Sequence, residues 1–450
     1  MSMGPWNAKA FFERYAYAIE QELTSTPGVA PTWAPGHPQE WGQEKAAVRL
    51  GQDSHSTPAL SPDDRLLAVG VGEDVHIYEV ATQELVQVLK GHSGTVEAVQ
   101  FSGATYDHGY LLASDSQAPI PDDILGGTTS AAILWHLDRH GKPLSPIVEE
   151  AGTGGVPADA NLRFEGGELG RYGSSPFSPD GKTLVFLRGN QTTQYDEEEG
   201  RSRDAASLPS VTLWSLEGRA ARQQLRGHTD AIQWIAASPD SSRVASAAWD
   251  GTARIWDAAT GALLRVLGPW NEDGANPHGG QLWAGAWSPD GSHLAVARGD
   301  PTARAYVCEI ATGRTASSVD FGVQARSLAW SPDGRTVACG GGGATLVLWD
   351  PYTGREQMRW CLAFGHDVRM GRISSVRAVR FLNARGRGAK IIFQVNCGTV
   401  HVYDLETNEK YQFAKRAEDM PDSFPRAEPA CSTRLVVVPG SEGVLRLWDL

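Results

Sequence analysis

Short stretches in which hydrophobic and polar residues alternate recur along most of the chain, with turn residues between them. Alternation with a period of two predicts β-strands, and the turn signals between them predict hairpins. The clearest unit spans residues 227–267 and contains four such stretches, at 231–237, 243–247, 252–256 and 262–267. We therefore predict a small sheet of four strands for this unit.

Two turn signatures mark the ends of the predicted strands. Ser-Pro-Asp-Gly suits a type I turn, because Pro sets φ at the second position and Gly is favoured at the fourth. It occurs at 178–181, 288–291 and 331–334, with near copies at 61–64 and 238–241. The second signature joins Thr to a residue that tolerates positive φ, at 260–261, 312–313, 353–354, 407–408 and, less well, 82–83. Both signatures are turn devices rather than catalytic motifs.

The number of repeats follows from the ends of the predicted third strands. They lie at Tyr78, Trp135, Trp214, Trp256, Cys308, Trp349, Tyr403 and Trp448, and in most cases an Asp or a Glu comes next. The shortest spacing, from Cys308 to Trp349, is 41 residues. The chain is thus expected to contain eight units, and insertions account for the longer spacings.

Together these motifs resemble the WD-repeat family of β-propellers, whose four-stranded blades have Gly-His near the start and Trp-Asp at the end of the third strand. The resemblance covers about residues 45–450 and implies a single all-β propeller. We expect eight blades, with seven as the alternative. The last unit lacks a fourth strand, so we predict that the stretch 45–50 pairs with it and closes the ring.

In this family a His, a Ser or Thr, an Asp and the Trp form a buried hydrogen-bond network within a blade. The resemblance implies these roles for His228, Ser246, Asp250 and Trp256. Other units keep only part of the set: the second has His92, Ser114 and Trp135 without a turn Asp, the sixth has Cys339 in the Ser position, and the seventh has Cys397 in the Asp position. We therefore expect the ring to depend mainly on sheet packing.

Residues 1–44 are predicted to lie outside the ring. Phe12, Tyr15, Ile19 and Leu23 recur near helical spacing within 5–24, which predicts an amphipathic helix that packs on the propeller or binds a partner. The stretch 25–44 is rich in Pro and Gly, as is typical of a linker. Inside the ring, inserted loops are expected at about 103–110, 117–130, 151–173, 190–208, 268–280, 365–373 and 414–431. Such loops often carry binding function.

Composition and charge limit the class of protein. With 41% hydrophobic and 21% charged residues the chain is predicted to be globular. No apolar run approaches the roughly 20 residues that span a bilayer, and the N-terminus lacks a signal-peptide pattern. We expect a soluble intracellular protein, cytoplasmic or nuclear, with no membrane partner. A net charge of -13 argues against broad binding to nucleic acid.

Catalytic and metal-binding signatures are absent from the sequence. It contains no GxxxxGKS/T phosphate loop, no HExxH, no GxSxG and no CxxC pair, and its five cysteines are odd in number. The acidic run at 196–199 lacks calcium-loop spacing. We therefore expect no cofactor, no metal and no enzyme activity.

The candidate partner-binding residues are identified by their position in the repeat. Counting four residues back from the end of each first strand gives Glu97, Gln233, Trp283, Arg326 and Arg377, with Trp234 beside them. The resemblance implies that these six rim residues face the rim of the central channel, which many family members use to bind partners. Trp and Arg are enriched at binding hot spots. The alternative is that Trp283 and Trp234 pack between blades and that the arginines pair with local acids.

A basic patch is also predicted between Cys361 and Lys390. It sets seven positive side chains against Asp367: Arg369, Arg372, Arg377, Arg380, Arg385, Arg387 and Lys390. Such a patch could meet RNA, a phosphopeptide or an acidic protein tail, or it could form a solvated face. No aromatic stacking platform accompanies it, so nucleic acid is the weaker choice.

We accordingly predict a non-catalytic scaffold for protein–protein interactions, monomeric by itself. It would present the channel rim and the inserted loops to partner proteins within a multiprotein assembly. The alternative is a reader of an acidic or phosphorylated ligand, namely a phosphopeptide, an acidic tail or RNA, through an Arg-rich face.

Overall fold

The computed structural model describes most of the ring and leaves several segments aside. The described residues are 44–50, 56–104, 106, 109–119, 128–149, 160–171, 174–189, 208–270, 280–299, 303–321, 324–342, 345–361, 375–382, 390–395, 400–405, 410–413, 428–432, 434–439 and 443–449. The predicted helix at 5–24, nearly all of the linker at 25–44 and the acidic run at 196–199 lie outside these residues. Every regular element in the described part of the chain is a β-strand.

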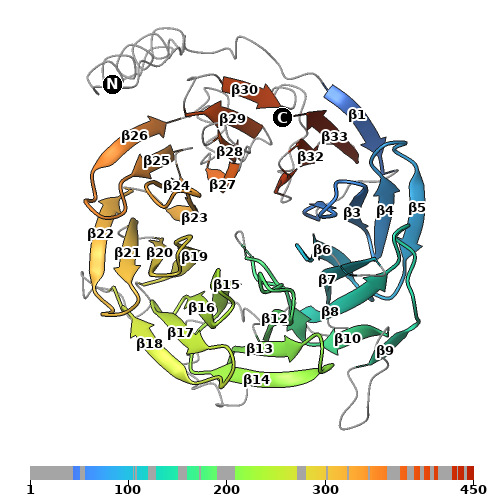
Figure 1. Ribbon diagram of the computed structural model, residues 1–450, viewed down its shortest axis with the longest axis horizontal. Coiled ribbons are helices and arrows are strands. Elements are labelled where there is room, and N and C mark those ends of the chain that lie inside the picture. Colours follow the sequence, from blue (N-terminus) through green and yellow to red (C-terminus); the bar gives the residue numbers. More distant parts are fainter. Residues whose placement is uncertain are drawn as a thin grey trace, which may run out of the picture.

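Eight small sheets stand around a central axis, and each is built mainly from consecutive strands (Figure 1). We number them blades 1–8 and give their strands from the innermost outward. Blade 1 contains β2 (Ala59–Leu60), β3 (Leu66–Val71), β4 (Asp74–Glu79) and β5 (Leu85–Leu89). Blade 2 contains β6 (Thr95–Phe101), β7 (Tyr110–Pro119), β8 (Thr128–Leu137), β10 (Asn161–Glu165) and β9 (Ile147–Glu149). Blade 3 contains β11 (Gly167–Glu168), β12 (Thr183–Arg188), β13 (Ser210–Ser215) and β14 (Ala220–Arg226).

The remaining blades follow the same order. Blade 4 contains β15 (Ile232–Ala237), β16 (Arg243–Ala248), β17 (Ala253–Asp257) and β18 (Leu263–Leu267), and blade 5 contains β19 (Leu282–Trp287), β20 (His293–Arg298), β21 (Arg304–Glu309) and β22 (Thr315–Asp320). Blade 6 contains β23 (Ala325–Trp330), β24 (Val337–Gly341), β25 (Thr345–Trp349) and β26 (Glu356–Cys361). Blade 7 contains β27 (Val376–Leu382), β28 (Lys390–Val395), β29 (Val400–Asp404) and β30 (Lys410–Phe413). Blade 8 contains β31 (Ala430–Cys431), β32 (Leu435–Pro439), β33 (Val444–Asp449) and β1 (Glu44–Arg49). The predicted all-β propeller with eight blades is confirmed, and the alternative of seven blades is wrong.

The ring closes in blade 8, where β1 pairs antiparallel with β33. Val48 lies opposite Leu445, and the backbone N–H of Leu50 donates to Gly443 O at 2.8 Å. Val48 and Leu50 are buried in a hydrophobic cluster that combines residues of blades 8 and 1. The strand from the beginning of the described chain thereby gives the last blade its fourth strand.

Blade 2 departs from the predicted four strands. The insertion expected at 151–173 contains β10 and β11, and β9 lies parallel to β10 as a fifth strand. Leu162 and Phe164 of β10 are fully buried, and the Phe164 ring lies 5.0 Å from that of Trp214 in blade 3. The alternation of Leu162 and Phe164 is thus a strand pattern inside a Gly-rich insertion. The insertions expected at 117–130 and 414–431 likewise contain strand residues, from β7, β8 and β31.

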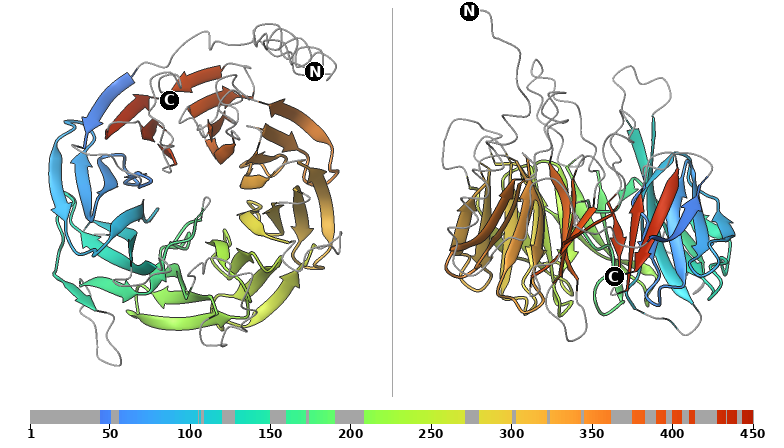
Figure 2. Two further views of the ribbon diagram at one scale, coloured as in Figure 1. Left: turned by 180° about the vertical axis from the view of Figure 1, so that it is seen from behind. Right: turned by 90° about the horizontal axis from the view of Figure 1, so that it is seen from above.

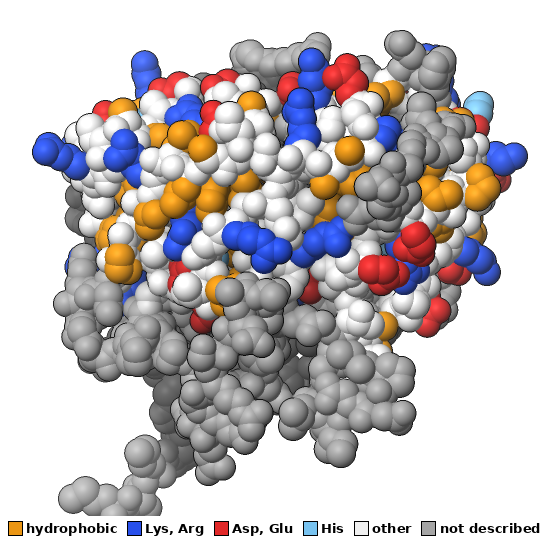
Figure 3. Space-filling view, turned by 90° about the horizontal axis from the view of Figure 1, so that it is seen from below, with side chains coloured by type: hydrophobic (Ala, Val, Ile, Leu, Met, Phe, Trp, Pro, Cys, Tyr) orange, Lys and Arg blue, Asp and Glu red, His pale blue; other side chains and the backbone are white. Residues whose placement is uncertain are grey.

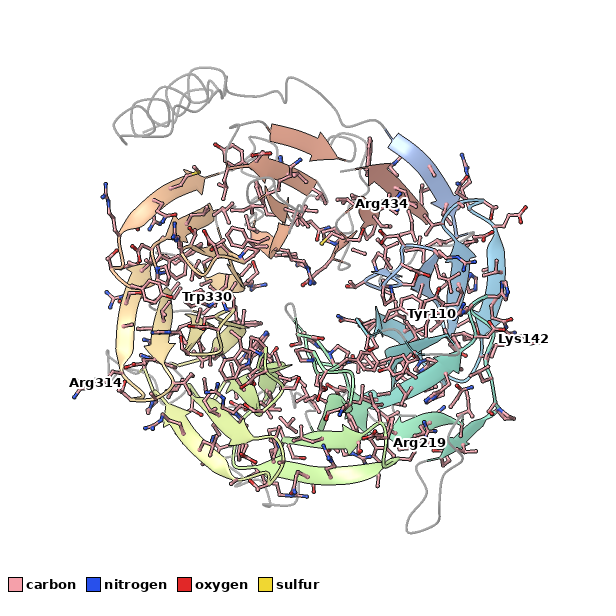
Figure 4. The ribbon with its side chains drawn as sticks, viewed as in Figure 1. Tyr110, Lys142, Arg219, Arg314, Trp330 and Arg434 are labelled. Atoms are coloured by element: carbon pink, nitrogen blue, oxygen red, sulfur yellow. The ribbon has the colours of Figure 1, made fainter. Side chains whose placement is uncertain are left out.

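Hydrophobic side chains fill the interfaces between neighbouring blades. Eight buried clusters occur in the described part of the chain, and each draws its residues from two adjacent blades. Polar contacts between neighbouring blades add to this packing, and Trp330 and Tyr110, which make two of them, are labelled in Figure 4. Trp330 Nε1 donates to Ala286 O at 3.0 Å, which links blades 6 and 5, and Tyr110 Oη donates to Asp63 Oδ2 at 2.7 Å, which links blades 2 and 1. The blades therefore form one continuous packed ring.

The two faces of the disc differ in their connections. The strands run across its thickness (Figure 2), so each innermost strand begins at one face and ends at the other. We call these the start face and the turn face. Ser-Pro-Asp-Gly turns follow the innermost strands at the turn face, where Ser288 Oγ donates to Asp290 Oδ1 at 2.6 Å and Gly291 takes a φ of 69°. The starts of the innermost strands lie on the opposite side, at the start face.

The four residues assigned to the blade network meet inside blade 4. Ser246 Oγ lies 2.8 Å from His228 Nε2 and accepts the Trp256 Nε1–H at 3.1 Å, and His228 Nδ1 donates to Asp250 Oδ2 at 2.8 Å. Burial lowers the pKa of His228 against the opposing effect of Asp250, so the imidazole is neutral. Burial alone would raise the pKa of Asp250, but hydrogen bonds from His228, Thr252 and the backbone lower it to about 2.

Blade 2 contains a shorter version of this network. His92 Nε2 lies 2.7 Å from Ser114 Oγ, which also accepts the Trp135 Nε1–H at 2.7 Å. His92 Nδ1 is buried and has no hydrogen-bond partner among the described residues. Burial, together with the charge of Arg163, lowers the pKa of His92 to about 3. Blade 2 thus tolerates the missing Asp by keeping its His uncharged.

A buried carboxylate lies where blade 2 meets blade 3. Asp115 of β7 accepts the backbone N–H of Leu169 at 3.0 Å on Oδ2, whereas Oδ1 has no hydrogen-bond partner among the described residues. Burial raises the pKa of Asp115 to about 7; the Leu169 N–H and Arg171 oppose this, and Glu168 and Glu97 add to it. Asp115 is therefore protonated over a wider range of pH in the folded protein than an exposed carboxyl group would be.

We expect Ser246→Ala to lower the free energy of unfolding by about 1–3 kcal/mol, because the substitution leaves buried polar groups of His228 and Trp256 without their shared partner. Ser242→Ala is the control, since Ser242 is exposed in the turn before β16. Urea unfolding of both variants measures the difference. Equal stabilities of the two variants would contradict a contribution from the buried network.

We expect the stability of the wild type to contain a pH-dependent part that Asp115→Asn removes. Since the folded pKa is raised, this contribution is complete below the unfolded pKa, near 3.8, and is lost as the pH rises through about 7. Unfolding free energies measured by urea across this range should therefore fall more steeply with pH for the wild type than for Asp115→Asn. Parallel curves for the two proteins would rule out titration of Asp115.

Candidate partner-binding rim

Five of the six predicted rim residues share one backbone feature. Each is the extra residue of a β-bulge near the beginning of an innermost strand: Glu97 in β6, Gln233 in β15, Trp283 in β19, Arg326 in β23 and Arg377 in β27. A bulge bends the strand and changes the direction of a side chain, and bulges are common beside functional sites. The count of four residues from the strand end therefore identifies one repeated bulge position near the start face.

Trp283 makes a tilted aromatic contact and a cation–π contact that together join three blades. Its ring centroid is 5.1 Å from that of Trp249, which follows β16 in blade 4. On the blade 6 side, Arg326 Cζ lies 4.9 Å from the Trp283 ring centroid. Gly299 makes room for the indole, because a Cβ there would come within 2.5 Å of Trp283 Nε1. We call Trp249, Trp283 and Arg326 the rim stack.

The guanidinium of Arg326 is held in position by neutral partners. Its Nε donates to Gln324 Oε1 at 2.9 Å, and Nη2 donates to the same oxygen. Arg326 is partly buried, and no ion pair with a carboxylate of the described residues is formed. An Arg stacked on an aromatic ring keeps its planar set of N–H donors for carboxylate or phosphate.

The side chains of Gln233 and Trp234 are buried, in contrast to the prediction for the rim. Trp234 is 2% exposed and packs in the core between blades 4 and 5, where a Cβ on Gly285 would come within 2.5 Å of its ring. Gln233 is 5% exposed, and its backbone oxygen accepts the N–H of Arg171 at 3.2 Å. Trp234 thus takes the packing role that was the alternative in the sequence.

The remaining rim residues differ in their surroundings. Glu97 is partly buried and lies near Asp115, whose pKa it helps to raise. Arg377 is partly buried and lines a cavity in the inner wall of the ring. The structure therefore places Trp283 and Arg326 in direct contact, while Glu97 and Arg377 belong to separate surroundings.

The predicted basic patch does not form a single face in the part that the structure describes. Arg377 lies near the beginning of β27 and Lys390 at the beginning of β28, and β27 crosses the disc between them. Arg380 pairs with Glu428 at 3.1 Å, and Lys390 lies 3.9 Å from Asp404. Arg369, Arg372, Arg385 and Arg387 lie outside the described residues. The patch is continuous in sequence but is divided by the strand that runs through it.

Trp249 and Gln324 are the residues of the site that the sequence did not identify. Trp249 lies in the connection from β16 to β17 rather than on an innermost strand, so a count along the innermost strands cannot find it. Its sequence signal is a large aromatic residue in a turn, directly before Asp250. Its indole Nε1 is buried without a hydrogen-bond partner among the described residues.

The outer wall of the ring offers a surface of another kind. Exposed hydrophobic side chains lie among Lys and Arg on the side of the disc in Figure 3. Strand β18 contributes Leu263, Leu264 and Val266 to the exposed hydrophobic residues, and β5 contributes Leu85 and Val86. Among the residues that the structure describes, there is no helix capable of crossing a membrane and no group of three or more metal-ligating side chains.

Comparisons with known proteins agree with this architecture. The family model described as WD domain, G-beta repeat matches residues 220–257 and 317–350. The chain is 27% identical over 270 residues to Apoptotic protease-activating factor 1 of Homo sapiens, which is 56% of this chain and 20% of that protein. It is also 27% identical over 282 residues to Cell division cycle 20.1, cofactor of APC complex, of Arabidopsis thaliana, which is 56% of this chain and 58% of that protein. The chain thus spans less than two thirds of either relative.

A solved structure extends the likeness to almost the whole chain. The crystal structure of the computationally designed Ika8 protein superposes with a TM-score of 0.61 at 15% identity, covering 91% of this chain and 100% of that one. At this identity the likeness concerns the fold alone. The recurring Trp-Asp strand ends, the two matched repeats and the ring of eight blades make this chain a WD-repeat β-propeller protein.

Proposed function

We propose that this protein is a non-catalytic interaction scaffold that binds partner proteins at the start face of blades 4–6. The observation that carries this proposal is the rim stack, in which Trp249, Trp283 and Arg326 are already ordered against one another. Trp and Arg supply much of the binding energy at protein interfaces. Groups that are ordered before binding lose little conformational entropy when a partner arrives.

The surroundings of the blade 4 network support a non-catalytic role. His228, Ser246 and Asp250 are residue types that can form a nucleophilic triad, and they meet at hydrogen-bond distance. However, Ser246 is fully buried and already accepts the Trp256 indole N–H, so its hydroxyl cannot reach a substrate. The same residue types therefore serve the stability of the blade.

The description of one relative supports the proposal that this protein works within a multiprotein assembly. Cell division cycle 20.1 of Arabidopsis thaliana is described as a cofactor of the APC complex, and more than half of this chain aligns with it. A rigid ring with a defined rim suits the same kind of role. The proposal for this chain is accordingly a subunit that holds partner proteins together.

The reader of an acidic or phosphorylated ligand is kept as a second candidate because of Arg326. Its guanidinium edge has a neutral partner in Gln324 rather than a carboxylate, as described above. A carboxylate or a phosphate on a partner would therefore gain a charge-assisted hydrogen bond at this point. Arg380 and Lys390 lie outside the rim stack and close to local acids, so this candidate rests on Arg326.

We expect the variants Trp283→Ala and Arg326→Gln to lose partner proteins that the wild type retains during purification from its native extract. Loss of one hot-spot residue corresponds to about 2 kcal/mol, or about 30-fold in affinity. Leu264→Ser is the matched control, since Leu264 is exposed on the outer wall and distant in the fold from the rim stack. Quantitative mass spectrometry of the three preparations, with circular dichroism to check folding, measures the outcome. The rim proposal would be wrong if the two rim variants kept these partners, or if only Leu264→Ser lost them.

The two candidate functions predict different effects of salt and of the substitution Arg326→Lys on binding. Binding to a phosphorylated or acidic ligand should weaken steeply with ionic strength, and Arg326→Lys should weaken it because Lys lacks the planar pair of donors. A scaffold contact dominated by the Trp283 ring should change little in salt and should tolerate Arg326→Lys. Titration of each purified partner at low and high salt distinguishes these cases.

A further inference from the structure

A cavity of about 380 Å³ lies in the inner wall of the ring, lined by residues of blades 6, 7 and 8. Its size is in the range of pockets that hold small molecules or single side chains. Among the described residues, the polar part of the lining contains Ser327, Arg377, Arg380, Glu428 and Cys431, and the apolar part includes Phe381. Since β27 runs from Arg377 near the start face toward the turn face, the cavity follows this strand through part of the disc.

An ion pair stands in the wall of the cavity. Arg380 Nη2 lies 3.1 Å from Glu428 Oε2, while 38% of the Arg380 side chain and 17% of the Glu428 side chain remain exposed. A contact with the blade 1 region holds the backbone of Glu428 in place. The backbone N–H of Glu428 donates to Thr57 Oγ1 at 3.1 Å. The other guanidinium nitrogens of Arg380 form no hydrogen bond with the described residues and are not sealed from solvent. They can therefore donate to a ligand without breaking the ion pair.

A buried hydroxyl lies in the same wall. Ser327 of β23 is 3% exposed, and its Oγ has no hydrogen-bond partner in the described part of the chain. An unsatisfied buried hydroxyl is unfavourable unless a ligand or water supplies the missing bond. Ser327 lines the cavity together with Arg377 and Arg380, so one small group inside the cavity could satisfy it.

The charges of the lining indicate the sign and the size of that group. Two arginines face one glutamate, and burial raises the pKa of the Cys431 thiol, so this cysteine stays neutral. Among the described residues that line the cavity, basic side chains outnumber acidic ones by one. A group with a single negative charge suits Arg380 beside Glu428, whereas a doubly charged phosphate would meet stronger repulsion from Glu428.

We propose that this cavity is a binding site for one carboxylate group on a short aliphatic chain. The carboxylate would accept hydrogen bonds from Arg380 and Ser327, with Arg377 adding to the positive potential, and Ala378, Val379 and Phe381 would contact the aliphatic part. Either a glutamate side chain of a bound peptide or a free dicarboxylic acid has this chemistry. The site is separate from the rim stack and goes beyond the proposed scaffold function, on which it does not depend.

Cys431 provides a local reporter for the test, because its partly buried thiol lines the cavity. The rate of its alkylation by iodoacetamide is measured by mass spectrometry of the peptide that contains it, with and without a probe. The probes are glutarate and a Gly-Ser peptide with one Glu, and a peptide with Gln in place of Glu is the control. Protection is expressed as the ratio of the two rates within each protein, so that altered reactivity in a variant cancels.

We expect glutarate or the Glu peptide to slow alkylation of wild-type Cys431 in the millimolar range, while the Gln peptide has no effect. Arg380→Gln should reduce the affinity about tenfold or more, since a charge-assisted hydrogen bond is lost. Ser327→Ala, a milder change, should reduce it several-fold, and Glu428→Gln should increase it because the competing carboxylate is neutralised. Trp283→Ala should leave protection unchanged, so the result does not depend on the rim proposal.

Two results would overturn the carboxylate site. One is the absence of protection by either probe in both the wild type and Glu428→Gln. The other is protection that persists unchanged in Arg380→Gln and Ser327→Ala. Protection by the peptide alone would identify a peptide as the source of the carboxylate, and equal protection by glutarate would show that a free acid suffices.

Discussion

The antiparallel pairing of β1 with β33 is the contact on which the rest of the ring depends. A single four-stranded blade cannot cover both of its hydrophobic faces, and it becomes stable only between two neighbours. All eight hydrophobic clusters are shared by adjacent blades, including the one between blades 8 and 1 that contains Val48 and Leu50. Without β1, this cluster would lose side chains and the circle would have an open interface. The rim stack and the inner cavity, which each need three adjacent blades, rely on the same closed circle.

Packing dominates over the buried hydrogen-bond networks in holding the blades. Blade 4 has the complete set around His228, but in blade 6 the Ser position is occupied by Cys339, and Trp349 Nε1 has no hydrogen-bond partner among the described residues. Trp349 is nevertheless fully buried in the cluster between blades 5 and 6. The large apolar area of its ring offsets the unsatisfied N–H. Loss of a polar group from one blade is therefore tolerated because the interface remains apolar.

Local signals made the strands and turns predictable, whereas contacts between distant segments were not. Ser-Pro-Asp-Gly specifies its own turn, since Ser288 and Asp290 bond to each other within it. In contrast, β10 is a strand because Phe164 packs on Trp214, which lies 50 residues away in sequence. The rim shows the same division. Counting along the innermost strands identified the bulge that contains Trp283. The count could not show that Trp234 of blade 4 is buried in the core, because the space for its ring is provided by Gly285 of blade 5. The basic patch failed as a single face for the related reason that a strand separates Arg377 from Lys390.

The repeated bulge also explains how a nearly symmetric ring has an uneven distribution of charge around its channel. A bulge recurs at this position in blades 2, 4, 5, 6 and 7, and the residue at the bulge is Glu, Gln, Trp, Arg and Arg in turn. Glu97 and Glu168 make the region of blades 2 and 3 acidic, with Arg171 as the opposing charge. Arg326, Arg377 and Arg380 make blades 6 and 7 basic on the opposite side of the circle (Figure 1). Charge complementarity determines the orientation of a partner more than its affinity. A partner bound across the rim would therefore direct its acidic part toward blades 6 and 7, where Arg326 of the rim stack and the proposed carboxylate site lie.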